Sequence, residues 1–231
     1  MMDKHQQLAG ILCQLTTDLL TNNTIDYNGL NLEKIRLNCR IGSGHATYCK
    51  YDARQQLFTI TYGKKMIKSK FGDYQITHWL TYREIIKHNY FDGNTSLLNV
   101  LTHTVCHEFS HLIQQHFKWH IKGSVHNDKF YNILEHFYDT GVAAEIRDRL
   151  SEACKTQKIS LRQIKEPTQL PDNESINFSL NDTVCFIHKN KTIKGKITKI
   201  NRKTIVITTG RLFNQTLWRV PKSLVQPLDI K

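Results

Sequence analysis

The chain has 231 residues, of which 39% are hydrophobic and 23% are charged, and its formal net charge is +12. This composition is typical of a folded globular protein and excludes a disordered chain, and the length allows one domain or two small ones. No apolar run reaches the roughly 18 residues of a membrane-spanning helix, so we expect no membrane partner. The first apolar stretch is short and polar residues interrupt it, which does not predict a secretory signal. We therefore expect a cytoplasmic protein.

Residues 1–154 predict a first domain that mixes helices and strands. Apolar residues at helical spacing between positions 8 and 19 predict an amphipathic helix packed on a core. The segment 34–63 has the pattern of a β-meander, and its last part, LFTITYG, alternates as a strand does. Further helices are expected at 78–91, from Thr95 or Ser96 to before Gly123, from Asn127 or Asp128 onward, and at 143–153.

The remainder of the chain predicts a linker and a second, smaller domain. Residues 155–178 contain Pro167 and Pro171 and few large apolar side chains, as linkers do. Short strand patterns about ten residues apart then predict a small antiparallel barrel over residues 179–231. The expected fold class is therefore α+β, with a helix-and-sheet domain followed by an all-β barrel.

The six cysteines include no C-x-x-C pair, which excludes a zinc ribbon or a thioredoxin-like site. In a reducing compartment they are expected to be free thiols. A disulfide between Cys39 and Cys49, across a predicted hairpin, is the alternative if the protein is exported.

The segment LTHTVCHEFSHLIQQHF contains the motif H-E-x-x-H at His107, Glu108 and His111. In a helix, the two histidines lie one turn apart on one face, where both can bind one zinc ion. Glu108 is next to the first ligand, so it can take a proton from a water that zinc has acidified and pass it to a leaving amine. The motif therefore predicts one zinc per chain and the chemistry of peptide hydrolysis.

Two histidines hold a metal poorly, so a third ligand is expected. The metzincin pattern requires glycine and histidine where this chain has Gln114 and Phe117, which excludes that class. His126 is the favoured ligand, because it follows a break at a glycine and opens the next predicted helix. Glu135 and Glu145 remain as carboxylate alternatives.

Other polar residues near the motif have less defined roles. His103 lies two turns before His111, about 12 Å along the helix, which is too far to share the ion. It could support a ligand, contact substrate or lie on the surface. His103, Tyr131 and Tyr138 are open candidates for the group that stabilises the oxyanion.

The last quarter of the chain is strongly basic. Residues 180–231 contain eleven lysines and arginines against two aspartates, a balance of +9 out of the total of +12. This predicts a sequence-independent DNA contact, with an acidic protein as the alternative partner. Trp218 could stack on a base but is more readily explained as a core residue. The expected nucleic-acid contacts are Lys191, Lys194, Lys196, Lys199, Arg202, Lys203, Arg211 and Phe213.

At the metal motif the sequence resembles the SprT/Spartan family of zinc metalloproteases. In that family H-E-x-x-H is followed by a histidine that opens a helix, commonly as H-G-x-x-F. Here HEFSH is followed by HNDKF, so His126 matches the histidine and Phe130 the aromatic residue, while Asn127 replaces the glycine. The resemblance covers roughly residues 1–150.

The resemblance implies a zincin-like domain in which a small antiparallel sheet accompanies the active-site helices. It also implies that His107, His111 and His126 bind zinc and that Glu108 is the catalytic base. Many members carry a four-cysteine zinc ribbon after this domain. Here the basic segment stands in its place and resembles an SH3-like or KOW-like barrel.

The leading expectation is a zinc-dependent peptidase that acts on DNA-associated proteins, because the eukaryotic branch of the family cleaves proteins crosslinked to DNA. Such a protein would associate with the nucleoid. The main alternative is a non-proteolytic DNA-binding protein with a structural zinc site. A metal-dependent hydrolase of a non-peptide substrate is the third possibility.

Overall fold

The computed structural model describes residues 3–21, 25–121, 123–161, 178–188, 191–201, 204–210, 215–222 and 225–228. The chain divides into two compact units, Met1–Glu166 and Pro167–Lys231, and each has its own hydrophobic core. Helices and strands are both present, so the fold is mixed α+β. Within the described ranges, no helix has the length and apolar character needed to cross a membrane.

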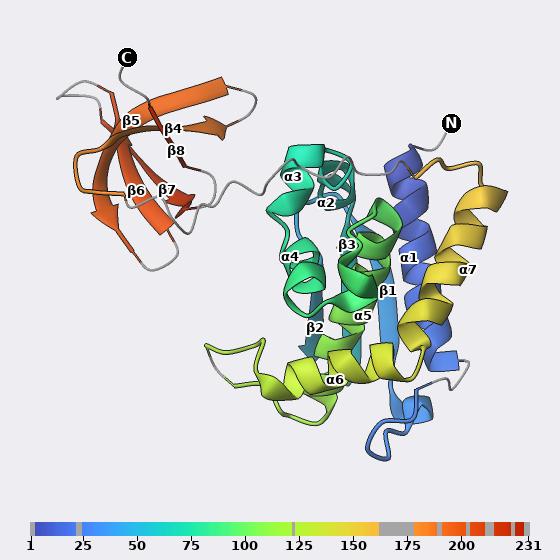
Figure 1. Ribbon diagram of the computed structural model, residues 1–231. Coiled ribbons are helices and arrows are strands. Elements are labelled where there is room, and N and C mark those ends of the chain that lie inside the picture. The colour runs from blue at the N-terminus through green and yellow to red at the C-terminus, as the bar shows by residue number, and fades with distance from the viewer. Residues whose placement is uncertain are drawn as a thin grey trace. The chain divides into compact units, whose positions relative to one another are not determined.

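The first unit is built around the helix α5 (Figure 1). This central helix packs against α1, α4, α6 and α7 and against the edge strand of the sheet, and most of its residues are buried. The α-helices are α1 (Lys4–Thr21), α2 (Lys64–Ser69), α3 (Asp73–Thr77), α4 (Leu80–Lys87), α5 (Leu97–His116), α6 (Asp128–Asp139) and α7 (Val142–Thr156).

The helix starts follow the capping residues in the sequence. The Ser96 hydroxyl accepts a hydrogen bond from the Asn99 N–H at the start of α5, and Asn127 accepts one from the Phe130 N–H at the start of α6. The helices α2 and α3 are too short to show a helical period, and the sequence pattern does not predict them. Helix α7 continues to Thr156, two residues beyond the predicted domain end at residue 154.

The sheet of the first unit differs from the predicted antiparallel meander. Its strands are β1 (Leu37–Gly42), β2 (Tyr48–Asp52) and β3 (Leu57–Gly63), in the order β1-β3-β2. Strand β2 pairs with β3 antiparallel, but β1 pairs with β3 parallel, so the sheet is mixed. The reason lies in burial, because β3 is buried along most of its length whereas β1 and β2 have exposed positions. The most apolar strand therefore takes the centre.

This strand order also excludes the Cys39–Cys49 disulfide. Both cysteines pair with Ile60, from opposite sides of β3. Two strand spacings separate their backbones by roughly 9–10 Å, which is beyond disulfide reach. All six cysteines are free thiols.

The second unit is an antiparallel sheet in the order β7-β6-β5-β4-β8. The first four strands along the chain occupy the segments where alternating residues predict strands. Their inward side chains, with Val225, form a small core that contains Val184, Phe186 and Ile207. The strands are β4 (Thr183–His188), β5 (Lys191–Ile200), β6 (Thr204–Thr209), β7 (Thr216–Pro221) and β8 (Gln226–Pro227).

Candidate metal centre

Three histidine side chains converge beside α5. His107 and His111 lie one turn apart on α5, with ring centroids 4.8 Å apart. His126 comes from the loop before α6, and its Nε2 is 3.1 Å from Nε2 of His111 and 3.3 Å from Nε2 of His107. The structure thus brings together the three predicted ligands and turns the same ring nitrogen of each toward one point.

This donor set fits a metal ion. Three imidazole nitrogens that bind one tetrahedral zinc ion at 2.0–2.1 Å lie about 3.3–3.4 Å apart, close to the spacing of the His126 nitrogen from its two neighbours. Burial, together with the adjacent His107 and His126, lowers the pKa of His111 to about 3. His111 is therefore held neutral, which is the form that binds metals. These histidines are one of two groups in the described residues that could hold a metal ion.

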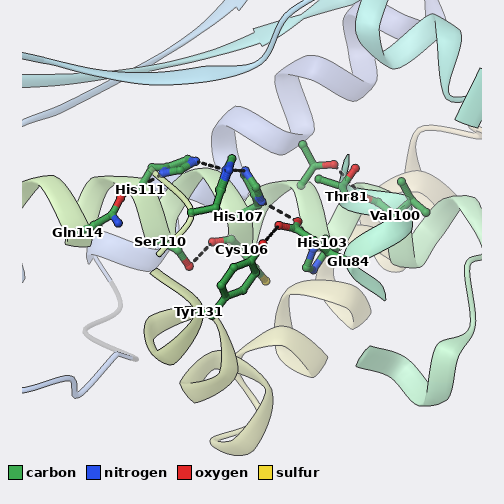
Figure 2. A network of polar contacts seen from close by, with 12 residues as sticks. Thr81, Glu84, Val100, His103, Cys106, His107, Ser110, His111, Gln114 and Tyr131 are labelled. Atoms are coloured by element: carbon green, nitrogen blue, oxygen red, sulfur yellow. Dashed lines mark hydrogen bonds and ion pairs between the residues drawn. The ribbon is translucent and has the colours of Figure 1, made fainter. Parts of the chain in front are cut away.

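The second group consists of Glu84, His103 and His107. Glu84 extends from α4, and its Oε2 accepts hydrogen bonds from His107 Nδ1 at 2.9 Å and from His103 Nε2 at 3.0 Å. Its Oε1 accepts a hydrogen bond from the Tyr131 hydroxyl at 3.2 Å (Figure 2). Although burial alone raises the pKa of Glu84, the hydrogen bonds from the two histidines hold it well below its usual range.

These hydrogen bonds decide between the two groups. Because Glu84 is a carboxylate, both histidine nitrogens that face it carry protons, and the Tyr138 hydroxyl donates to the remaining nitrogen of His103 at 2.6 Å. The second group is thus a satisfied hydrogen-bond network. The bond from Glu84 also leaves the Nε2 lone pair of His107 free to face His111 and His126, as carboxylates behind metal-binding histidines do. The three-histidine group is the better metal site.

The loop that carries His126 is held on both sides. Gln114 on α5 donates from Nε2 to the Val125 carbonyl at 2.8 Å and to Asn127 Oδ1 at 3.0 Å. Asn127 in turn donates from Nδ2 to the Trp119 carbonyl at 3.1 Å. Gln114 is one of the two residues that exclude the metzincin pattern, and it positions the residues that flank His126.

Glu108 has the environment of a reactive carboxylate. It is 5% exposed, and in the part of the chain that the structure describes its Oε2 has no hydrogen-bond partner. Burial raises the pKa of Glu108 to about 7, against the opposing effect of His107 and Lys70. An unpaired buried carboxylate oxygen is costly, so this arrangement favours a partner from outside the protein, such as water or a substrate.

A cavity of about 830 Å³ opens onto these groups. It is lined by the three histidines, by Glu108 and by side chains of β2, including Tyr48 and Tyr51. Strand β2 is at the edge of the sheet, since it pairs only with β3 among the described strands. The site therefore lies beside a strand edge.

The other candidate ligands lie elsewhere. Glu135 is 3.9 Å from Nδ1 of His88, and Glu145 is 3.8 Å from Arg149, and neither lines the cavity. His103, Tyr131 and Tyr138 do not line it either, so their expected contact with substrate or oxyanion is not supported. His103 is completely buried, and the surface alternative for it is wrong.

Glu84 is absent from the residues that the sequence pattern predicted for the site, although a signal exists. Glu84 stands three residues after Thr81 and directly before Ile85, and all three are buried. A carboxylate within the buried stripe of a helix requires partners, and that pattern alone indicates a polar network.

The predicted basic contacts are only partly within the described residues. Lys194, Lys196 and Lys199 lie on β5 and are exposed, and a β-bulge between Ile197 and Lys199 shifts the register. Without the bulge, strict alternation would turn Lys199 to the same side as the buried Ile197. The backbone of Lys191 belongs to β5, but its side chain lies outside the described residues, as do Arg202, Lys203, Arg211 and Phe213.

Trp218 has the contacts of a core residue. Its ring packs against Phe186 with centroids 5.4 Å apart, and its Nε1 donates to the Thr209 hydroxyl at 3.0 Å. Its polar and apolar parts are both engaged within the sheet, which favours the core role over base stacking.

No family model, curated protein or solved structure matches this chain. The SprT-like assignment therefore depends on the motif residues and stays a prediction.

Proposed function

We propose that this protein is a zinc-dependent peptidase of the SprT-like type, with a zincin-like catalytic domain. The observation that carries the proposal is the meeting of three histidine Nε2 atoms beside an unpaired, buried Glu108 carboxylate. Three protein ligands leave a fourth tetrahedral position open, which is typical of catalytic zinc, whereas structural zinc is usually closed by four.

The protein groups have separable roles in the proposed reaction. Zinc in this site supplies a Lewis acid that acidifies water and polarises a substrate carbonyl. Glu108 Oε2 accepts the proton of the attacking water and returns it to the leaving amine. Glu84 keeps the proton of His107 on Nδ1, and Gln114 with Asn127 keeps His126 in place.

The position of β2 supports a peptide as substrate. An edge strand presents backbone groups with which an extended chain can pair, and recognition by strand addition uses this property. Because β2 lines the cavity next to Glu108, a peptide that pairs with β2 would pass beside the reactive groups. A small non-peptide substrate has no need of this edge.

The second unit supports localisation to DNA. We propose that it forms an SH3-like barrel whose lysine-bearing strand β5 contacts phosphates. Lys194, Lys196 and Lys199 are exposed on that strand, and the C-terminal quarter of the chain carries most of the net positive charge. Proteins held on DNA are therefore the proposed substrates.

The deciding experiment combines zinc content with cleavage of a casein or histone substrate, with DNA present and absent. We expect about one zinc per chain in the wild type. Glu108→Gln should keep zinc and fold but lose cleavage by at least about a hundredfold, in line with the usual contribution of a general base. Glu135→Gln, which changes a carboxylate outside the cavity, should cleave as the wild type does.

The ligand set is tested by His126→Ala with His120→Ala as the matched control. His120 is an exposed histidine in the same loop. Loss of zinc in His126→Ala alone would support the three-histidine site. If the wild type and Glu108→Gln both bind zinc and neither cleaves the substrate, the peptidase is rejected. The alternative of a DNA-binding protein with a structural metal would then remain.

A further inference from the structure

The cavity is lined by a buried lysine, Lys70. This lysine follows α2 directly and is 1% exposed. Its Nζ donates hydrogen bonds to the Thr81 hydroxyl at 2.7 Å and to the Thr104 hydroxyl at 2.9 Å, and it lies 5.4 Å from the centre of the Trp79 ring. All four residues line the cavity.

In the described part of the chain, Lys70 forms no ion pair with a carboxylate. An ammonium group has three N–H donors, and the two hydroxyls take two of them. Among the described residues the third donor has no acceptor, and Glu108 and Glu84 act on Lys70 only through space. Burial lowers the pKa of Lys70 to about 7, and these carboxylates oppose that effect. A buried ammonium gains most from an anion that reaches it.

The surrounding wall suits a carbon chain that ends in a negative charge. Phe58, Met66 and Trp79 give the cavity an apolar lining. Glu108 is the only carboxylate among the described lining residues, whereas Lys70 and Lys118 both line it. Charge and lining together favour an acidic side chain or a free carboxyl terminus.

The distance from the reactive groups matches a neighbouring substrate residue. Thr104, which holds Lys70, is four positions before Glu108 on α5, and therefore about 6 Å along the helix. Extended peptide residues are spaced about 3.3 Å apart. A carboxylate on a residue next to the cleaved bond can thus reach Lys70.

We propose that Lys70, held by Thr81 and Thr104, forms a subsite for a substrate carboxylate and selects peptides with an acidic group beside the cleaved bond. This selectivity rests on the proposed peptidase function. The Lys70 ammonium binds and orients the carboxylate and takes no part in proton transfer.

The first test scans Glu against Gln through each position around one cleavable bond in a fluorogenic peptide. The wild type should show a kcat/KM for one Glu peptide at least about tenfold above its Gln partner, as expected for a buried hydrogen bond between charged groups. A parallel pair with a free or amidated carboxyl terminus distinguishes an acidic side chain from a terminal carboxylate. If kcat/KM of the wild type differs by less than about twofold in every Glu/Gln pair and in the pair with a free or amidated terminus, the proposal is overturned.

The second test compares Lys70→Met with Lys68→Met. The methionine keeps a buried apolar stem at position 70, and Lys68 is an exposed lysine on α2. Lys70→Met should raise KM for the Glu peptide, so that the ratio of kcat/KM between the Glu and the Gln peptide falls to near one. Lys68→Met should keep the wild-type ratio. If Lys70 has only a structural role, Lys70→Met will lower kcat/KM equally for the Glu and the Gln peptide. The ratio of the two values would then stay unchanged, which would reject the subsite.

A binding measurement separates this proposal from the peptidase itself. Zinc-loaded Glu108→Gln should bind the labelled Glu peptide more tightly than the Gln peptide in fluorescence polarisation, and the added Lys70→Met change should remove the difference. Cleavage by the wild type with equal binding of both peptides would overturn the subsite and leave the peptidase standing. Selective binding without any cleavage by the wild type would reject the peptidase and support the carboxylate site.

Discussion

Glu84 shows how much of the site depends on single buried side chains. Its carboxylate receives hydrogen bonds from His107, His103 and Tyr131, from three different turns of two helices. Partners of this kind set the tautomer and orientation of a metal-binding histidine. The chemistry of His107 therefore depends on a residue 23 positions earlier in the chain.

We expect Glu84→Gln to weaken zinc binding by about 10- to 100-fold, the usual effect of removing such a partner. The amide has no negative charge and only one acceptor atom for the three donors that converge on Glu84. Competition with a chromogenic chelator measures the affinity, and Glu145→Gln, near Arg149 and away from the cavity, is the control. An affinity within about threefold of the wild type would show that Glu84 does not position His107.

At the scale of helices and strands, the start of α6 determines where His126 lies. Asn127 caps this helix through the Phe130 N–H and also contacts Gln114 and the Trp119 carbonyl. The same side chain therefore begins the helix and secures the loop from which His126 reaches His107 and His111. Glycine at this position could begin a helix but has no side chain for these contacts.

Asn127→Ala should lower the free energy of unfolding by about 1 kcal/mol, because the helix loses its cap, and it should also weaken zinc binding. Ser96→Ala removes the equivalent cap from α5, at the end remote from the metal site. It should cost similar stability without affecting zinc. Chemical denaturation and chelator competition on both variants test this, and equal zinc affinities would mean that the cap does not hold His126.

Across the molecule as a whole, charge is distributed unevenly along the chain. The C-terminal quarter holds nine of the twelve net positive charges, and Lys194, Lys196 and Lys199 of β5 are exposed, the last of them beyond the β-bulge. Neutralisation of phosphates by lysines releases counterions, so affinity for DNA falls with salt in proportion to the number of phosphates neutralised.

Changing Lys194, Lys196 and Lys199 together to Gln should reduce the slope of log K against log salt by about 2.7, at about 0.9 for each phosphate that is no longer neutralised. Fluorescence anisotropy with a duplex of arbitrary sequence at several salt concentrations measures the slope. A triple variant of Lys34, Lys65 and Lys68, which are exposed lysines of the first unit, is the control. Equal slopes in the two variants would contradict DNA binding through β5.

Features that depend on neighbours along the chain could be predicted before the fold was known. The spacing of His107 and His111, the capping of α5 and α6 and the alternation of the second unit follow from fixed helical and strand periods. Those periods are set by local backbone geometry, so a few consecutive residues suffice to predict them.

Contacts between residues that are far apart in the sequence were decided only by the tertiary structure. Packing placed Glu84 behind His107, Lys70 beside Thr104 and β3 between β1 and β2. It also brought His126, and not Glu135, to the other two histidines. Each of these depends on which apolar surfaces are buried together, and that is a property of the whole core. The sequence therefore predicts the metal motif, and the packing of the core supplies the residues that hold and surround it.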